Sequence, residues 1–132
     1  MRVWSSGLVA AGLILSAGAL ATIAGAQALA GDPVKGQAVF DDQCSMCHTI
    51  KDDGQGPHLG GVVGRKAGSV AGAEYTDAMK ASGITWTPDK LDQFLTGPDK
   101  MVPGTAMPVS VADPVERRNL IAYLASTAAS GH

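Results

Sequence analysis

Cys44-Ser45-Met46-Cys47-His48 is the stretch of this sequence that decides its fold. Two thiols three positions apart, followed at once by an imidazole, form the attachment signature of a c-type heme. Each thiol can form a thioether bond with one vinyl group of the porphyrin, and His48 is then placed to ligate the iron. The motif therefore predicts one covalently bound heme c, held through Cys44 and Cys47 and ligated by His48.

Two other interpretations of the cysteine pair are weaker in this chain. The sequence contains only two cysteines, which excludes a zinc site with three or four thiolate ligands within one chain. A site with two thiolates and two imidazoles would need both His48 and His58, at a spacing unlike that of a zinc finger. A thioredoxin-like dithiol follows a β-strand, and no β-rich run precedes Cys44.

The first thirty residues have the layout of a secretory signal peptide. Arg2 is followed by an uncharged, apolar run over residues 7–26, and Ala28-Leu29-Ala30 forms a small-x-small cleavage site. We expect cleavage after this site, which divides the chain into a leader, residues 1–30, and a folded domain, residues 31–132. The alternative is an anchor on the periplasmic face of the inner membrane, because the apolar run approaches the roughly 20 residues that span a bilayer.

The composition of the domain suits a chain that folds around a cofactor and does not bind nucleic acid. A domain of about 100 residues buries only about two thirds of its unfolded surface, and aromatic side chains are few here, so a macrocycle would supply missing apolar area. Once Arg2 is removed with the leader, nine Lys and Arg stand against twelve Asp and Glu, a net charge of −3. This mildly acidic domain has no basic stripe, which argues against a nucleic-acid partner.

Capping signals predict four helical segments in the domain. They are Asp32-Pro33 to about Gln43, Thr76 to Ser82 before Gly83, Thr87-Pro88 to Gly97-Pro98, and a last helix that begins at the capping box Asp113-Pro114-Val115-Glu116. Gly36 and Phe40 share one face of the first helix. Because glycine disfavours a helix by roughly 1 kcal/mol, Gly36 indicates that another helix packs closely there.

The stretch from residue 60 to residue 72 contains five glycines and no clear period, so we expect a loop that wraps one edge of the heme. Arg65 and Lys66 lie within it, and each could face a propionate or water. His58, just before this loop, is interpreted as an exposed loop histidine. The carbonyl of Pro57 is a candidate acceptor for the second ring N–H of His48.

The second iron ligand is expected from residues 101–108, where two prolines and a glycine predict a stiff, extended loop. Met107, bracketed by a proline and a Gly-Thr turn, is the best-placed thioether. Met46 lies inside the attachment loop and cannot reach across the ring. Met79 falls among core-type positions of a predicted helix, and Met101 precedes the constrained part of the loop.

With these residues laid out, the chain resembles class I cytochromes c, and specifically their mitochondrial-like bacterial branch. The resemblance spans the whole domain and rests on Cys44-Ser45-Met46-Cys47-His48, Gly56-Pro57, Gly64-Arg65-Lys66, Tyr75-Thr76-Asp77-Ala78, Gly83-Ile84-Thr85-Trp86, Pro103-Gly104-Thr105-Ala106-Met107 and Leu120-Ile121-Ala122-Tyr123-Leu124. It implies an all-α cytochrome c fold, in which about four to five short helices and loops surround one covalently attached heme.

The resemblance also implies the site. His48 and Met107 are the expected axial ligands, and Pro57 is the carbonyl acceptor for His48. The residues expected around the propionates are Arg65, Tyr75, Trp86 and Thr105. The first and last helices are expected to cross, with Gly36 and Phe40 meeting the last helix near Leu120 and Tyr123.

The chain departs from the family pattern at several positions. Phe94 stands where the mitochondrial-type proteins usually have a tyrosine whose hydroxyl approaches the methionine sulfur. Met79 replaces an asparagine of the buried polar network, and Val109 replaces an aromatic residue that shields the heme edge. Asp99 and Ala106 stand where the eukaryotic proteins carry docking lysines. We therefore do not expect docking through a strongly salt-dependent ring of lysines.

The expected function is that of a soluble, monomeric, periplasmic one-electron carrier rather than an enzyme. By family analogy, its partners are a quinol–cytochrome c reductase and a terminal oxidase or reaction centre of a bacterial respiratory or photosynthetic chain, and it contacts the membrane only through them. The alternatives are a heme peroxidase or oxygen binder with an open sixth position, a heme subunit of a larger oxidase or dehydrogenase, and a thiol oxidoreductase.

Overall fold

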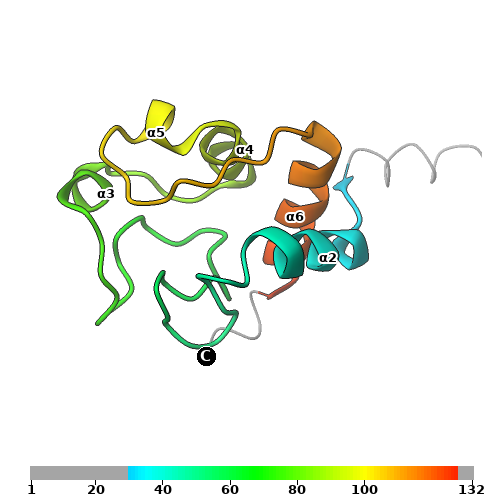
Figure 1. Ribbon diagram of the computed structural model, residues 1–132, viewed down its shortest axis with the longest axis horizontal. Helices are drawn as coiled ribbons and strands as arrows, with labels where there is room; N and C mark the ends of the chain where they lie inside the picture. Colours follow the sequence, from blue (N-terminus) through cyan, green and yellow to red (C-terminus); the bar gives the residue numbers. More distant parts are fainter. Residues whose placement is uncertain (1–29, 128–132) are drawn as a thin grey trace, which may run out of the picture.

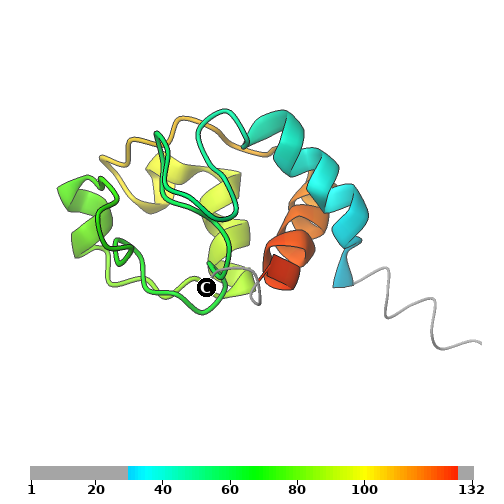
Figure 2. The ribbon, with the colours of Figure 1, turned by 90° about the horizontal axis from the view of Figure 1, so that it is seen from below.

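The structure, a computed structural model, describes residues 30–127, in which short helices are joined by long loops (Figures 1 and 2). A cavity lies between these helices and loops. The helices are α2 (Pro33–Gln43), α3 (Asp77–Ala81), α4 (Pro88–Thr96), α5 (Pro98–Met101) and α6 (Pro114–Ser126). Over this range the only β-type pairing is an isolated antiparallel bridge between Lys66 and Thr85. The expectation of an all-α fold is therefore confirmed.

The leader predicted for residues 1–30 lies outside the described residues, apart from Ala30. Between residues 30 and 127, none of the helices has both the length and the apolar character needed to cross a membrane.

Helices α2 and α6 lie side by side at one end of the molecule (Figures 1 and 2). The carboxylate of Asp32 caps α2 by accepting hydrogen bonds from the backbone N–H groups of Val34 and Lys35. A Cβ atom added to Gly36 would collide with the carbonyl group of Asn119 in α6. One turn later, the rings of Phe40 and Tyr123 pack with their centroids 5.6 Å apart. The expected meeting of the first and last helices is confirmed, and Gly36 is the residue that permits it.

The start of α6 differs in one respect from the predicted capping box. Asp113 accepts hydrogen bonds from the backbone N–H groups of Val115 and Glu116, as expected. The carboxylate of Glu116, however, accepts a hydrogen bond of 3.3 Å from Nε2 of Gln43 at the end of α2. The neighbouring helix supplies this donor, so Glu116 links α2 to α6 rather than completing the box.

The short helices of the middle of the chain begin at the predicted caps. Thr76 caps α3 and Thr87 caps α4 through their hydroxyl groups, and Gly83 follows α3 with φ of +67°. Three residues of α4, Leu91, Phe94 and Leu95, are buried. The ring of Phe94 lies 5.0 Å from that of Trp86. These contacts place one apolar face of α4 against the cavity.

Helix α5 is a correction to the sequence analysis, which predicted only a helix end at Gly97-Pro98. Proline at the first position of a helix is as favourable as proline after one, because its missing N–H is not needed there. The chain accordingly forms one further helical turn, α5, in which the N–H of Val102 donates to the carbonyl of Pro98 over 2.8 Å. The predicted loop at residues 60–72 does lack helix and strand.

Candidate cofactor site

A cavity of about 500 Å³ lies between the helices and the loops, and its lining is mostly apolar. Every candidate site residue lines it: Cys44, Cys47, His48, Pro57, Arg65, Tyr75, Trp86, Thr105 and Met107. These residues come from six separate stretches of the chain. Their convergence on one cavity is the main structural observation about the site.

The two cysteines stand at the end of α2, where the chain leaves the helix. The carbonyl of Cys44 accepts hydrogen bonds from the N–H groups of Cys47, at 3.1 Å, and of His48, at 3.0 Å. Burial raises the pKa of the Cys44 thiol to about 11. A thiol that resists ionisation is a poor redox nucleophile, which counts against a thiol oxidoreductase. Within residues 30–127, no group of three or more His, Cys, Asp or Glu side chains is arranged to hold a metal ion.

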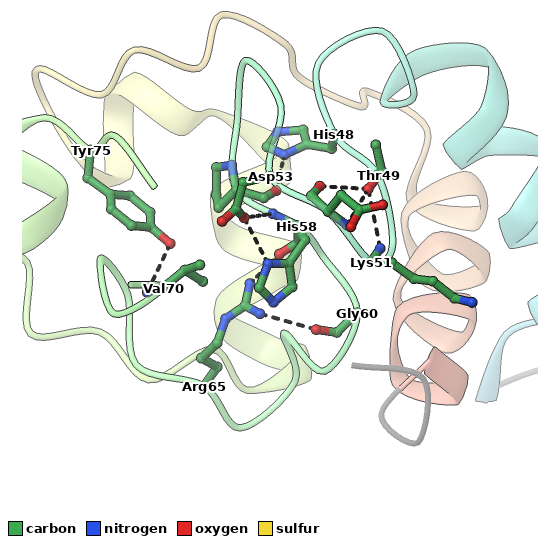
Figure 3. Close-up of polar contacts among 11 residues, drawn as sticks. His48, Thr49, Lys51, Asp53, His58, Gly60, Arg65, Val70 and Tyr75 are labelled. Atoms are coloured by element: carbon green, nitrogen blue, oxygen red, sulfur yellow. Dashed lines mark hydrogen bonds and ion pairs between the residues drawn. The ribbon is translucent and has the colours of Figure 1, made fainter. Parts of the chain in front are cut away.

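The ring of His48 is fixed by the loop that follows it (Figure 3). Its Nδ1 lies 2.7 Å from the carbonyl oxygen of Pro57. A proton on Nδ1 satisfies that carbonyl and leaves the lone pair of Nε2 free to bind a metal. Gly56 lies against the same ring, and a Cβ atom added there would lie 2.7 Å from Nδ1 of His48. The loop therefore holds the imidazole in one tautomer and one orientation.

The ring of His58 lies beside Asp53 (Figure 3). Oδ1 of Asp53 accepts hydrogen bonds of 2.8 Å from the backbone N–H and the ring Nδ1 of His58. These bonds, the backbone one above all, lower the pKa of the Asp53 carboxyl. His58 is partly buried rather than exposed, which corrects the sequence interpretation, and it does not line the cavity.

Arg65 and Lys66 are adjacent in the sequence but lie in different surroundings. Lys66 is exposed, whereas Arg65 is partly buried and lines the cavity. The guanidinium of Arg65 donates to the carbonyls of Gly60, at 3.1 Å, and His58, at 2.6 Å (Figure 3). Its buried Nε has no hydrogen-bond partner among the described residues, and burial lowers its pKa. A buried cation with an unused donor fits a carboxylate ligand, such as a porphyrin propionate.

Three further candidates line the cavity with polar groups or rings. The hydroxyl of Tyr75 accepts a hydrogen bond of 3.4 Å from the N–H of Val70, and burial raises its pKa (Figure 3). Trp86 is buried. The hydroxyl of Thr105 accepts a hydrogen bond of 3.3 Å from the N–H of Met107, which braces the turn before that methionine.

Two methionines line the cavity. Met107 does so from the loop between α5 and α6, whereas Met79 does so from α3. The sequence analysis placed Met79 only among core positions, and a five-residue helix is too short for a period to separate a cavity face from a core face. Met101 is absent from the lining, and Met46 is 92% exposed.

Heme c fits this donor set. Two thiols, an oriented imidazole, a thioether and an unused guanidinium N–H face one cavity, and each matches a functional group or the iron of the macrocycle. The sequence motifs found these polar groups but missed the apolar wall, to which Leu59, Val62, Leu95 and Leu120 contribute. No local signal marked those side chains as cavity residues rather than core.

Comparisons with known proteins agree with this chemistry. The family model described as cytochrome c matches residues 33–128. A cytochrome c2 of Rhodomicrobium vannielii is 44% identical over 130 residues, covering 96% of this chain and 97% of the relative. A cytochrome c of Arabidopsis thaliana is 46% identical over 100 residues, 73% of this chain and 89% of the relative. The solved structure of cytochrome cH from Methylobacterium extorquens is similar with a TM-score of 0.70 and 43% identity, covering 73% of this chain and 99% of that one.

Proposed function

This chain belongs to the cytochrome c family, and from that premise we propose that it is an exported one-electron carrier whose heme iron is ligated by His48 and Met107. Its cofactor is a covalent heme c, and it is an electron-transfer protein rather than an enzyme. The ligand pair, the compartment and the partners are the parts that we propose.

One observation carries the proposal of the ligand pair. His48 and Met107 are far apart in the sequence, and both line the cavity that Cys44 and Cys47 also line. His48 and Met107 would both ligate the iron of a heme attached at these cysteines, through an imidazole and a thioether. This pair would leave no ligand position open to oxygen or peroxide, which favours electron transfer.

The residues of the cavity support this function in distinct ways. When bound, heme c supplies an iron that accepts and releases one electron. The thiols of Cys44 and Cys47 form the two thioether bonds, and Pro57 holds the proton on Nδ1 of His48. The unused Nε of Arg65 balances the charge of a propionate. The buried ring of Trp86 excludes water.

The side chains near Met107 tune the reduction potential. A thioether is a soft ligand that favours the ferrous iron and raises the potential. Phe94 and Met79 add apolar groups to the cavity. The family pattern has a tyrosine hydroxyl at the first position and an asparagine amide at the second. A less polar surrounding changes the relative stability of the two charge states of the iron, so both residues contribute to the potential.

We further propose that the protein works in the bacterial periplasm as a monomer. The leader-like residues 1–30 support export, with anchoring through residues 7–26 as the alternative. The partners proposed are a quinol–cytochrome c reductase as the electron donor and a terminal oxidase or photosynthetic reaction centre as the acceptor. Similarity to a cytochrome c2 of a bacterium supports this place in a respiratory or photosynthetic chain.

Carbon monoxide binding to the reduced protein tests the closed sixth position. We expect slow, weak binding at neutral pH, because Met107 must leave the iron first. Rapid and tight binding would indicate an open position and favour a peroxidase or oxygen-binding protein instead.

Mass spectrometry of the protein purified from the periplasm tests export and attachment together. The expected mass is that of residues 31–132 plus one heme. A mass that retains residues 1–30 would support the anchored alternative. Elution of the native protein with a larger complex on size exclusion would contradict the free monomer.

A further inference from the structure

Arg117 is a buried cation on α6 that the heme site does not use. It is 9% exposed, and the hydrogen bonds of its side chain all reach residues outside α6. Its Nε donates to Oδ1 of Asp92 on α4 over 2.8 Å. Its Nη1 donates to the carbonyl oxygens of Val111 and Ala112, each over 2.9 Å. One guanidinium thus connects α4, α6 and the end of the loop that carries Met107.

The loop between α5 and α6 (Figure 1) is held by hydrogen bonds at its two ends. At the first end, the N–H of Thr105 donates to the carbonyl of Val102 over 2.9 Å, and Met107 donates to the hydroxyl of Thr105. At the second end, the N–H of Val111 donates to the carbonyl of Leu95 in α4 over 2.8 Å. Residues 108–110 make no backbone hydrogen bond with any described residue.

The second end of the loop depends on Arg117, because Arg117 is the side chain that donates to the carbonyls of Val111 and Ala112. Val111 is 1% exposed, so its carbonyl has no access to bulk water that could replace a lost donor. Only three residues, 108–110, separate Met107 from Val111, and none of them makes a backbone hydrogen bond with a described residue. A shift of Val111 therefore passes directly along the chain to Met107.

We propose that Arg117 is a positioning residue for the Met107 thioether. By holding the carbonyls of residues 111 and 112 against α4 and α6, it fixes the far end of the span that presents the sulfur to the iron. Loss of the guanidinium lets this span move while α2 and α6 remain packed. The sulfur–iron bond then opens before the protein unfolds. This inference rests on the proposed ligation by Met107.

The test compares Arg117→Gln with Arg118→Gln in the ferric holoprotein. Arg118 is the next residue of the same helix and is exposed, so it controls for the loss of one positive charge from α6. During a urea titration, the long-wavelength absorption band of thioether-ligated ferric heme reports the sulfur–iron bond, and far-ultraviolet circular dichroism reports the helices. The measured quantity is the separation between the urea midpoints of the two signals.

We expect Arg117→Gln to lose the band at a clearly lower urea concentration than its helices, with a wider separation than in the wild type or Arg118→Gln. We also expect carbon monoxide to bind the reduced Arg117→Gln protein about tenfold faster or more, because its rate follows the fraction of open molecules. If Arg117→Gln does not fold, Arg117→Lys, which keeps the charge without the fork of donors, is measured in the same way.

The outcomes separate the two proposals. If the wild type shows the band and the separation is unchanged in the Arg117 variants, Arg117 contributes only to global stability and this inference is wrong. If the wild type itself lacks the band, ligation by Met107 is wrong, and this inference is wrong with it.

Discussion

The carbonyl oxygen of Pro57 lies 2.7 Å from Nδ1 of His48, and the residue before this proline, Gly56, packs so closely on the imidazole that a side chain there would collide with it. The two contacts act together. The carbonyl sets which nitrogen carries the proton, and the absent side chain of Gly56 leaves the space that the ring occupies. The loop after the attachment motif therefore holds His48, the proposed proximal ligand, in one tautomer and one orientation.

Gly56→Ala should displace the His48 ring. A Cβ atom there would lie 2.7 Å from Nδ1, and the backbone next to Pro57 cannot give way easily. Overpacking of this kind costs roughly 1–3 kcal/mol. We expect the holoprotein to unfold at lower urea with an altered Soret spectrum. Gly54→Ala is the control, because its Cβ would meet the Cys47 carbonyl at an ordinary 3.5 Å. Equal behaviour of the two variants would contradict this account of the loop.

Gly36→Ala sets helix propensity against helix packing. Propensity alone favours alanine by roughly 1 kcal/mol. The new Cβ would collide with the Asn119 carbonyl and lie 2.8 Å from Cβ of Tyr123, so the packing of α2 on α6 opposes it. We expect a net loss of roughly 1–3 kcal/mol in the free energy of unfolding. Urea unfolding measures it, with the exposed Gln37→Ala of the same helix as the control. A stabilised Gly36→Ala protein would show that the two helices are not in close contact.

Phe94→Tyr should change the reduction potential. Phe94 is 6% exposed and lines the cavity with Met107. A hydroxyl placed there can donate a hydrogen bond to the thioether and withdraw electron density from the ligand. A net bond of about 0.5–1.5 kcal/mol corresponds to a rise of roughly 20–60 mV for one electron. Voltammetry measures the shift, and Tyr123→Phe, at a residue that does not line the cavity, is the control. An unchanged potential would mean that Phe94 does not approach the sulfur.

Ionised Asp53 should stabilise the folded protein, and this contribution should be lost at acidic pH. Hydrogen bonds from the His58 backbone and ring lower the pKa of Asp53 in the folded protein. The unfolded chain then binds a proton more readily at this site, so the contribution is present above the unfolded pKa and is lost as the pH falls through the folded one. Between about pH 5 and pH 3, the free energy of unfolding should decrease less in Asp53→Asn than in the wild type. Asp42→Asn, which removes another exposed carboxylate, serves as the control. If the free energy of unfolding of Asp53→Asn fell with pH as steeply as that of the wild type, this role of Asp53 would be contradicted.

The sequence predicted the parts of the fold that depend on neighbouring residues, such as the starts of helices. The caps Asp32, Thr76, Thr87 and Asp113 begin the helices where the structure has them. The same kind of signal missed α5, because a Gly-Pro pair after a helix can end it or begin another turn. Capping residues thus predicted where a helix starts, but they did not predict that a new helix begins directly after α4.

The contacts that the sequence did not predict join residues that no sequence motif or helical spacing connects. Arg117 and Asp92 lie 25 positions apart, and Gln43 and Glu116 lie 73 apart, so only the packing of α4, α2 and α6 brings them together. The pair of Asp53 and His58 forms across a loop, where no period applies. The candidate ligands were predictable for a different reason, since the attachment motif and the proline-rich loop each specify a chemistry that few arrangements can satisfy.

The most direct test of the central claim is the ferric absorption spectrum of two matched variants, Met107→Leu and Met79→Leu. Both methionines line the cavity, so each change removes one thioether from the same surroundings and keeps an apolar side chain of similar volume. The account predicts that the long-wavelength thioether–iron band disappears in Met107→Leu and persists in Met79→Leu. A band that survives in Met107→Leu, or that is lost in Met79→Leu, would contradict it.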